Sequence, residues 1–130
     1  MRRLAIIRNQ QGQAMVEFAL VLPVLLLILL GIVQFGIAYS HSLTLTDAVR
    51  AGAREAAVSR TAANPTAAAT QAVLNSASDL NPSKVAVTVS SDWVAGDSVT
   101  VSATYPYSIS ILGIVVSAGS LHSTTTERVE

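Results

Sequence analysis

The feature that most constrains this chain is an apolar run near its N-terminus. No Asp, Glu, Lys or Arg occurs in residues 18–46, and residues 18–33 are almost entirely Leu, Val, Ile, Ala and Phe. Extended to residues 14–39, the run holds about 25 residues, or roughly 37 Å of α-helix at 1.5 Å per residue. A bilayer core needs about 20 such residues. The sequence therefore predicts a transmembrane helix over residues 14–39.

Charge is distributed unevenly about this run. Arg2, Arg3 and Arg8 precede it without any acidic residue, whereas the chain after Gly12 carries eight acidic and five basic residues. Positive charge beside an apolar helix marks the cytoplasmic side. We therefore expect the N-terminus in the cytoplasm and the C-terminal part outside it. That distal part is mildly acidic, which argues against nucleic acid as a partner.

The helical pattern continues beyond the predicted membrane span. Residues 43–63 are rich in Ala and contain no Pro, and the first strong helix breaker is the pair Asn64–Pro65. We therefore predict one helix over residues 13–63, kinked at Pro23 because proline removes a backbone hydrogen bond. Five charged residues form either a solvated face of this helix or charge pairs between packed helices: Asp47, Arg50, Arg54, Glu55 and Arg60. Of these, Asp47 and Arg50 have the spacing that favours an ion pair.

The remainder, residues 64–130, has the pattern of a small α+β head. A second helix is predicted over about Pro65–Ser78, with Asn64 as its cap. Alternating apolar residues then indicate two half-buried strands joined by a hairpin loop, and the tail indicates a third strand. We expect an antiparallel sheet of about three strands whose apolar face buries together with one side of the helix: Val85, Val87, Val89, Val99, Val101 and Tyr105 with Val73 and Leu74.

Two parts of this head leave alternatives open. Residues 107–118 are too apolar for a loop in water and too short to span a membrane. We favour a core-packing connection there over a contact for a partner subunit or the bilayer surface. Trp93 lies in the hairpin loop. We expect it to act as a lid that covers the sheet, rather than as a contact residue for a partner.

Candidate catalytic and metal-binding residues are scarce. The chain has no cysteine, and His41 and His122 are isolated from any second ligand at a suitable spacing. Ser117 lacks the first glycine of a nucleophile elbow. No phosphate-binding loop, dinucleotide-binding turn or paired carboxylate motif occurs. The sequence therefore favours a protein that is not an enzyme and that uses neither a cofactor nor a metal.

A simple membrane anchor does not explain Glu17. A carboxylate at the bilayer centre costs about 2.5–3.5 kcal/mol, and less near the interface, so we expect Glu17 to have a partner. If the chain were cut after Gly12, Gln13 would carry a new α-amino group and Glu17 would be the fifth mature residue. These opposite charges could pair between neighbouring chains and set the stagger between their helices.

The residues that raise this question also carry a family resemblance. The segment "QGQAMVEFALVLP" resembles the processing region of type IV prepilins, with a basic leader, Gly12, Glu17 as the fifth mature residue and an apolar helix. The fuller run from Gly12 to Gly36, followed by "AVRAGAREAA", is similar to the TadE-like minor pilins of tight-adherence (Tad) pilus systems. The resemblance is strong over residues 1–60 and weaker over 61–130, where "TYP" and "TERVE" are similar. Gln13 stands where many pilins have a hydrophobic first mature residue.

The resemblance implies a specific biology. A dedicated aspartic prepilin peptidase would cut after Gly12 at the cytoplasmic face, so that residues 1–12 are a leader peptide, and Glu17 would carry the assembly role. The implied partners are other pilins or pseudopilins contacted through the N-terminal helix, the inner-membrane pilus assembly platform and membrane lipid. The protein would be a single-pass inner-membrane subunit that helps to initiate or cap a pilus, and so takes part in adhesion.

Two other interpretations remain. The first is a signal-anchored envelope domain that never polymerises. The second is a secreted protein cut by ordinary signal peptidase after Ser40, although the apolar run is long for a signal peptide. The first residue of the mature chain separates the three: Gln13 for the pilin, Met1 for the anchored domain and His41 for the secreted protein.

Overall fold

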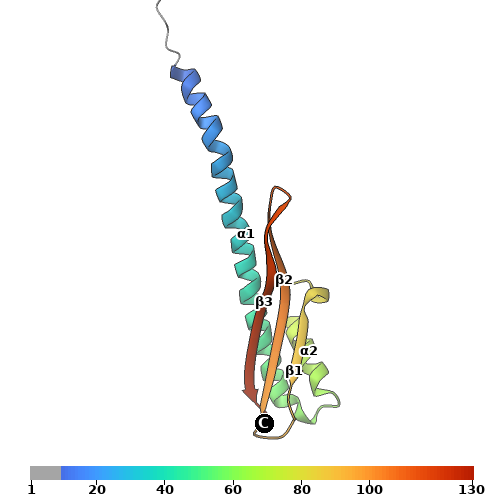
Figure 1. The fold of residues 1–130 in the computed structure, drawn as a ribbon. Helices are drawn as coiled ribbons and strands as arrows, with labels where there is room; N and C mark the ends of the chain where they lie inside the picture. The colour runs from blue at the N-terminus through green and yellow to red at the C-terminus, as the bar shows by residue number, and fades with distance from the viewer. Residues whose placement is uncertain (1–9) are drawn as a thin grey trace, which may run out of the picture.

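The computed structural model describes residues 10–130, which form an α+β protein around one long helix. Along the chain the elements are α1 (Gln10–Val58), the 3-10 turn η1 (Ser59–Thr61), α2 (Pro65–Ser76), the 3-10 turn η2 (Pro82–Lys84), β1 (Ala86–Ser90), β2 (Ser98–Ile111) and β3 (Ile114–Arg128) (Figure 1). The predicted α+β class, with a long N-terminal helix, a second helix and a three-stranded antiparallel sheet, is confirmed.

The ends of α1 differ from the predicted helix of residues 13–63. The α-helix starts at Gln10, and it ends at Val58 before η1 continues to Thr61. The chain turns between Thr61 and Pro65, where α2 begins. The Asn64 side chain accepts a hydrogen bond from the backbone N–H of Ala67 at 3.0 Å, with Pro65 in the first turn. This is the predicted cap. Of the expected leader, residues 1–9 with Arg2, Arg3 and Arg8 lie outside the described residues.

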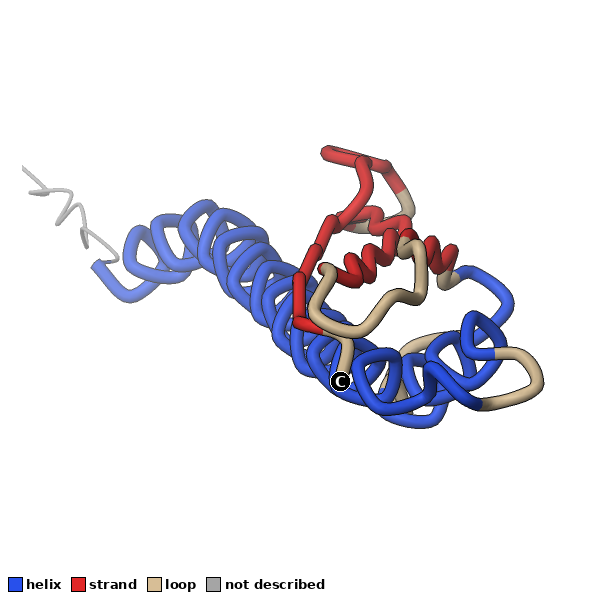
Figure 2. The backbone as a smooth tube through the Cα atoms, turned by 90° about the horizontal axis from the view of Figure 1, so that it is seen from below, coloured by secondary structure: helices blue, strands red, loops and turns tan. Residues whose placement is uncertain are grey.

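The C-terminal half of α1 is part of the head. Its small apolar side chains pack against α2 and the sheet, and Figure 2 shows the strands lying along one side of α1 with α2 beside its end. The members of the core that α1 contributes are Leu45, Ala48, Val49, Ala53, Ala56 and Ala57. The sequence places the head in residues 64–130 alone, but the structure adds about three and a half turns of α1 to its core.

The sheet has the order β1-β2-β3, with both neighbouring pairs antiparallel. Central strand β2 places Val101 opposite Val89 on one side and Thr125 on the other. The alternation predicted for β2 is confirmed, since its residues at 99, 101, 103 and 105 are buried. The burial predicted for β1 is only partial, because β1 is an edge strand: its Val87 and Val89 are half-buried, and so is Val85 just before it. In α2, Val73 is buried but Leu74 is half-buried and lies outside the core.

The two segments with open alternatives have different outcomes. Trp93 is half-buried against the core, as a lid over the sheet would be. The favoured interpretation of residues 107–118 is wrong, because they do not pack in the core. They form the far end of the β2–β3 hairpin, which rises beside α1 (Figure 1), with the turn at Leu112 and Gly113. Four of their large apolar side chains are exposed: Leu112, Ile114, Val115 and Val116.

Gly52 lies where α1 packs closely against α2. It is buried, and a Cβ built there would overlap Cγ2 of Val73 and stand 3.1 Å from the carbonyl oxygen of Ala69. The sequence shows Gly52 only as a weak point in the helix, because glycine costs about 1 kcal/mol relative to alanine in a helix. The packing reverses that expectation, since the absence of a side chain is what lets the two helices meet.

We therefore expect Gly52→Ala to lower the free energy of unfolding, by about 1–3 kcal/mol for overpacking. Denaturant unfolding of the full chain in detergent micelles measures this. Gly36→Ala is the matched control, because Gly36 lies on the same helix with nothing within 4 Å of its Cβ position. Equal or higher stability of Gly52→Ala would contradict the close approach of α1 and α2.

Candidate functional site

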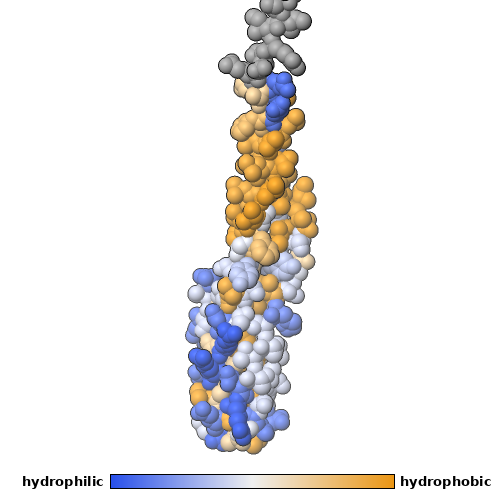
Figure 3. All heavy atoms as spheres, turned by 90° about the vertical axis from the view of Figure 1, so that its left-hand side faces the viewer, coloured by the Kyte–Doolittle hydropathy of each residue, from blue (hydrophilic) through white to orange (hydrophobic). Residues whose placement is uncertain are grey.

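The N-terminal half of α1 presents an apolar surface that the described chain leaves largely uncovered. On the face drawn in Figure 3, this half is almost uniformly hydrophobic, whereas the head below it is mostly polar. The large apolar side chains from Met15 to Tyr39 are exposed. A soluble protein rarely exposes a contiguous apolar patch of this size. One helix with this length and composition indicates a single-pass membrane anchor.

Glu17 lies within this apolar surface. It is the sole charged side chain in residues 10–46, and its neighbours Val16 and Phe18 are both exposed apolar residues. Its one hydrogen bond within residues 10–130 comes from the side-chain amide of Gln13, whose Nε2 donates to Oε1 of Glu17 at 3.1 Å. Gln13 is one helical turn before Glu17, so the two side chains lie on the same face. Among residues 10–130, the carboxylate therefore has a local polar contact but no cationic partner.

The bond between Gly12 and Gln13 lies in the first turn of α1, which begins at Gln10. The first four N–H groups of a helix have no partner within it, and glycine lowers helix stability by about 1 kcal/mol. The predicted cleavage at this bond stays a prediction.

Pro23 lies inside α1, and the helix continues through it without a break. The predicted kink at Pro23 stays a prediction. Pro23 also lines an apolar hollow between α1 and the end of the β2–β3 hairpin, together with Leu26, Leu27, Leu29, Leu30 and Leu112.

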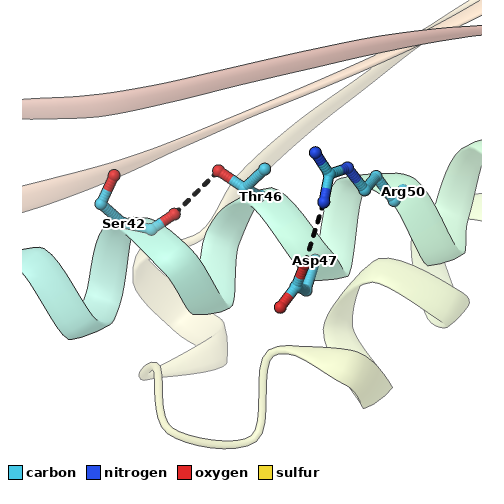
Figure 4. Close-up of polar contacts among 4 residues, drawn as sticks. All are labelled: Ser42, Thr46, Asp47 and Arg50. Carbon is cyan, nitrogen blue, oxygen red and sulfur yellow. Dashed lines mark hydrogen bonds and ion pairs between the residues drawn. The ribbon is translucent and has the colours of Figure 1, made fainter.

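The charged face of α1 lies below the apolar surface. Nη1 of Arg50 donates to Oδ1 of Asp47 at 3.4 Å, which is the ion pair predicted from the spacing (Figure 4). Both side chains are well exposed, so the pair adds little to stability. One turn earlier, the Thr46 hydroxyl donates to the carbonyl oxygen of Ser42 at 2.9 Å. These contacts fit a solvated helix face.

The described residues hold no arrangement that points to catalysis or metal binding. Within residues 10–130 no three His, Asp or Glu side chains converge. His41 packs edge-on against Tyr105, with ring centroids 5.6 Å apart, and His122 lies on β3. Ser117 is also on β3, paired with Ile109, so it does not occupy the strand–turn–helix position of a nucleophile elbow.

Two features escaped the sequence analysis. The role of Gly52 depends on the distance between two helices, which no local pattern reports. The sequence did contain a signal for the hairpin turn at Leu112 and Gly113. In "SILGIVV", segments that contain β-branched residues stand on both sides of a glycine. Hydropathy alone does not reveal the turn, because an apolar helix and an apolar hairpin of this length have similar hydropathy.

Comparison with known proteins matches residues 12–54 to a family described as TadE-like protein. The match starts at Gly12, contains Glu17 and the whole apolar surface, and ends in the charged face of α1. The resemblance identified from the sequence is thus confirmed for these residues, and it indicates a pilin-like protein of the Tad system. The TadE-like family is not a family of enzymes. No curated protein matches the chain, and no solved structure does.

Proposed function

We propose, from the TadE-like match of residues 12–54, that this chain is a minor pilin of a Tad pilus that helps to initiate or cap the filament, and so supports adhesion. The observation that carries the proposal is the position of Glu17, one turn after Gln13 in a helix whose apolar surface is largely exposed. A membrane anchor needs that surface but not the carboxylate. A helix that first lies in lipid and later packs among other helices needs both.

Maturation supplies a cationic partner for Glu17. A prepilin peptidase at the cytoplasmic face cuts after Gly12, and Gln13 then carries a free α-amino group. The Gln13 side chain already lies within 3.1 Å of Glu17 in the same chain. In a bundle, Glu17 of one subunit pairs with the amine of the next, and this charge pair fixes the stagger between helices. The head, outside the cytoplasm, then faces outward from the bundle.

The proposal names a set of partners. Other pilins or pseudopilins contact the apolar half of α1, the prepilin peptidase acts at Gly12, and the assembly platform of the inner membrane receives the processed subunit. Before assembly, the same apolar half of α1 lies in membrane lipid. The protein acts by binding and carries out no chemistry of its own.

The first test is processing. With the peptidase co-expressed, we expect the mature chain to begin at Gln13 and Gly12→Leu to block the cut. The physical reason is that a bulky side chain before the bond hinders an extended chain in the peptidase groove and also favours the helical first turn. Intact-mass measurement and N-terminal sequencing of the membrane fraction give the result.

Gly36→Leu is the control for this test, because it adds the same side chain to the same helix at a position with open space around it. It should be processed like the wild type. Continued cleavage of Gly12→Leu at the same bond would contradict the assigned site. A mature chain that begins at Met1 would support the signal-anchored domain, and one that begins at His41 would support a secreted protein.

A further inference from the structure

The β2–β3 hairpin extends well beyond the rest of the sheet. Strand β1 pairs only with Thr100–Thr104 of β2, so from Tyr105 onward the hairpin is a two-stranded arm. It runs along α1 toward the N-terminal half of the helix (Figure 1). A two-stranded hairpin is marginally stable in water unless it packs against something. The arm packs against α1 on one side, and its far end remains uncovered.

The far end of the arm, residues 111–116, is called the hairpin tip below. Its residues are Ile111, Leu112, Gly113, Ile114, Val115 and Val116. Leu112 is 78 % exposed and Ile114 71 % exposed. No Asp, Glu, Lys or Arg occurs in residues 98–126. The tip is therefore an exposed apolar patch at the end of an uncharged arm.

The turn residue itself is unusual. Leu112 and Gly113 both have positive φ, at 52° and 82°. A two-residue hairpin turn with this geometry favours Asn or Asp followed by Gly, because their short polar side chains tolerate the left-handed conformation. Leucine at this position has neither advantage. Turn formation therefore does not explain Leu112, whereas an apolar environment around the tip does.

The tip lies at the level of the membrane-spanning part of α1. Leu112 shares an apolar hollow with Pro23, Leu27 and Leu30, and Cδ1 of Ile111 lies 4.0 Å from the Cβ position of Gly31. Counted from Ala14, about 20 residues of α1 reach the outer edge of the hydrocarbon core, next to Gln34. The tip then lies roughly 5–15 Å inside that edge, at 1.5 Å per helical residue.

The residues just outside this level are those expected at a membrane surface. Tyr107 of the arm shares one hollow with Phe35, Tyr39 and His122, and tyrosine is enriched where lipid headgroups meet water. Lys84 lines a second hollow with Gln34. It is the only Lys or Arg between Arg60 and Arg128. A single cation at this level is placed to meet anionic headgroups.

We propose that the hairpin tip inserts into the outer leaflet of the bilayer beside α1, as a second membrane contact of the head. The inference rests on α1 spanning a bilayer. Lipid is the fitting occupant because the tip continues the apolar surface of α1 and because aromatic and cationic residues flank it in the order of a lipid interface. The open edges of the arm limit the insertion to the tip, since unpaired backbone groups in hydrocarbon are costly.

The consequence is a fixed orientation of the head relative to the membrane before assembly. One helix alone leaves the head free to rotate and tilt above the membrane. A second contact beside the helix holds the head so that the arm faces lipid. Assembly with other subunits then requires the tip to leave the bilayer with α1.

The chain has no cysteine, so single cysteines can report the environment of the tip directly. Leu112→Cys, labelled with a nitroxide, is reconstituted as the full chain at low protein-to-lipid ratio in phosphatidylcholine vesicles with a minor fraction of phosphatidylglycerol. We expect the label to be more accessible to oxygen than to a water-soluble nickel chelate. Val94→Cys, in the exposed loop between β1 and β2, should show the reverse, and Ile28→Cys should mark the membrane interior.

Two outcomes overturn the proposal. If Leu112→Cys behaves like Val94→Cys, the tip lies in water. If it is shielded from both relaxants and shows broadening between labels, a second copy covers the tip instead of lipid. The assay contains no other pilin and no peptidase, so its outcome does not depend on processing or assembly. A failure of the proposed function therefore leaves this result unchanged, and the converse also holds.

A second variant tests the chemical reason for insertion while the turn is kept. Leu112→Asn suits the left-handed turn but removes the apolar side chain. With the reporter at Val115→Cys, we expect the preference for oxygen to fall several-fold in the Leu112→Asn background, while Ile28→Cys and the near-ultraviolet circular dichroism stay the same. An unchanged preference at position 115 would contradict a role for Leu112 in holding the tip in lipid.

Discussion

Glu17→Val is expected to give a protein that is inserted, processed and folded but no longer co-purifies with other pilins or supports a pilus. The substitution makes the helix more apolar, so insertion should be at least as good. Gly12 and the preceding arginines are unchanged, so cleavage should continue. The loss appears only when helices pack together.

The expected loss of association follows from the positive charge that Glu17→Val leaves unpaired. Without Glu17, the amine of Gln13 in the neighbouring subunit is unpaired in a poorly hydrated bundle. Breaking one partner of a buried pair costs about 3–5 kcal/mol. That corresponds to a loss of roughly two to three and a half orders of magnitude in association, at about 1.4 kcal/mol per factor of ten. A pull-down with partner pilins, with wild type and variant side by side, measures it.

The chain offers two controls for this experiment. Gln34→Val also makes α1 more apolar but leaves Glu17 in place, so it should assemble. The double variant Val16→Glu/Glu17→Val keeps the composition and moves the carboxylate by about 100° around the helix, so it should fail. Equal recovery of Glu17→Val, with normal piliation, would remove the reason to assign Glu17 an assembly role and favour the signal-anchored domain.

Val101→Asp is expected to unfold the head. Val101 is fully buried on the central strand, between Val89 and Thr125 of its neighbours. No buried cation is near it, since the buried part of the described chain is apolar except for Ser59. An unpaired carboxylate there costs several kcal/mol, a large part of the 5–15 kcal/mol that typically stabilises a domain.

Thermal unfolding of the full chain in micelles, followed by near-ultraviolet circular dichroism, tests this prediction. The fragment of residues 64–130 is unsuitable, because it lacks the core residues that α1 contributes. Thr88→Asp is the matched control, since Thr88 lies on β1 facing solvent and the same side chain there should cost at most about 1 kcal/mol. An unchanged melting curve for Val101→Asp would contradict the burial of the β2 face.

Periodicity and capping predicted the elements of this fold because each depends on neighbours in the sequence. The cap at Asn64, the alternation of β2 and the pair of Asp47 with Arg50 are all local. The contribution of α1 to the core escaped the sequence analysis for the opposite reason. Leu45 and Val49 continue the same helix that crosses the membrane, and nothing local marks where α1 stops facing lipid and starts facing a sheet.

The candidate site shows the same division. Gly12 and Glu17 stand out in the sequence because a charge in an apolar run needs an explanation, and the family match covers both. Their roles in cleavage and assembly stay predictions. The hairpin tip was missed because the apolar character of residues 107–118 fits a core as well as a surface. Only the register of β2 with β3 places Leu112 beside Leu30 rather than inside the head.

The continuity of α1 has a mechanical consequence. The helix runs from Gln10 to Val58 without a joint, so a pull on its N-terminal half reaches the head along the packed stretch from Leu45 to Ala57. That stretch is about 18 Å long, and its contacts with α2 and the sheet carry the load together, in shear, instead of opening one after another. Tension that reaches the head along the helix is thus resisted by the whole core at once.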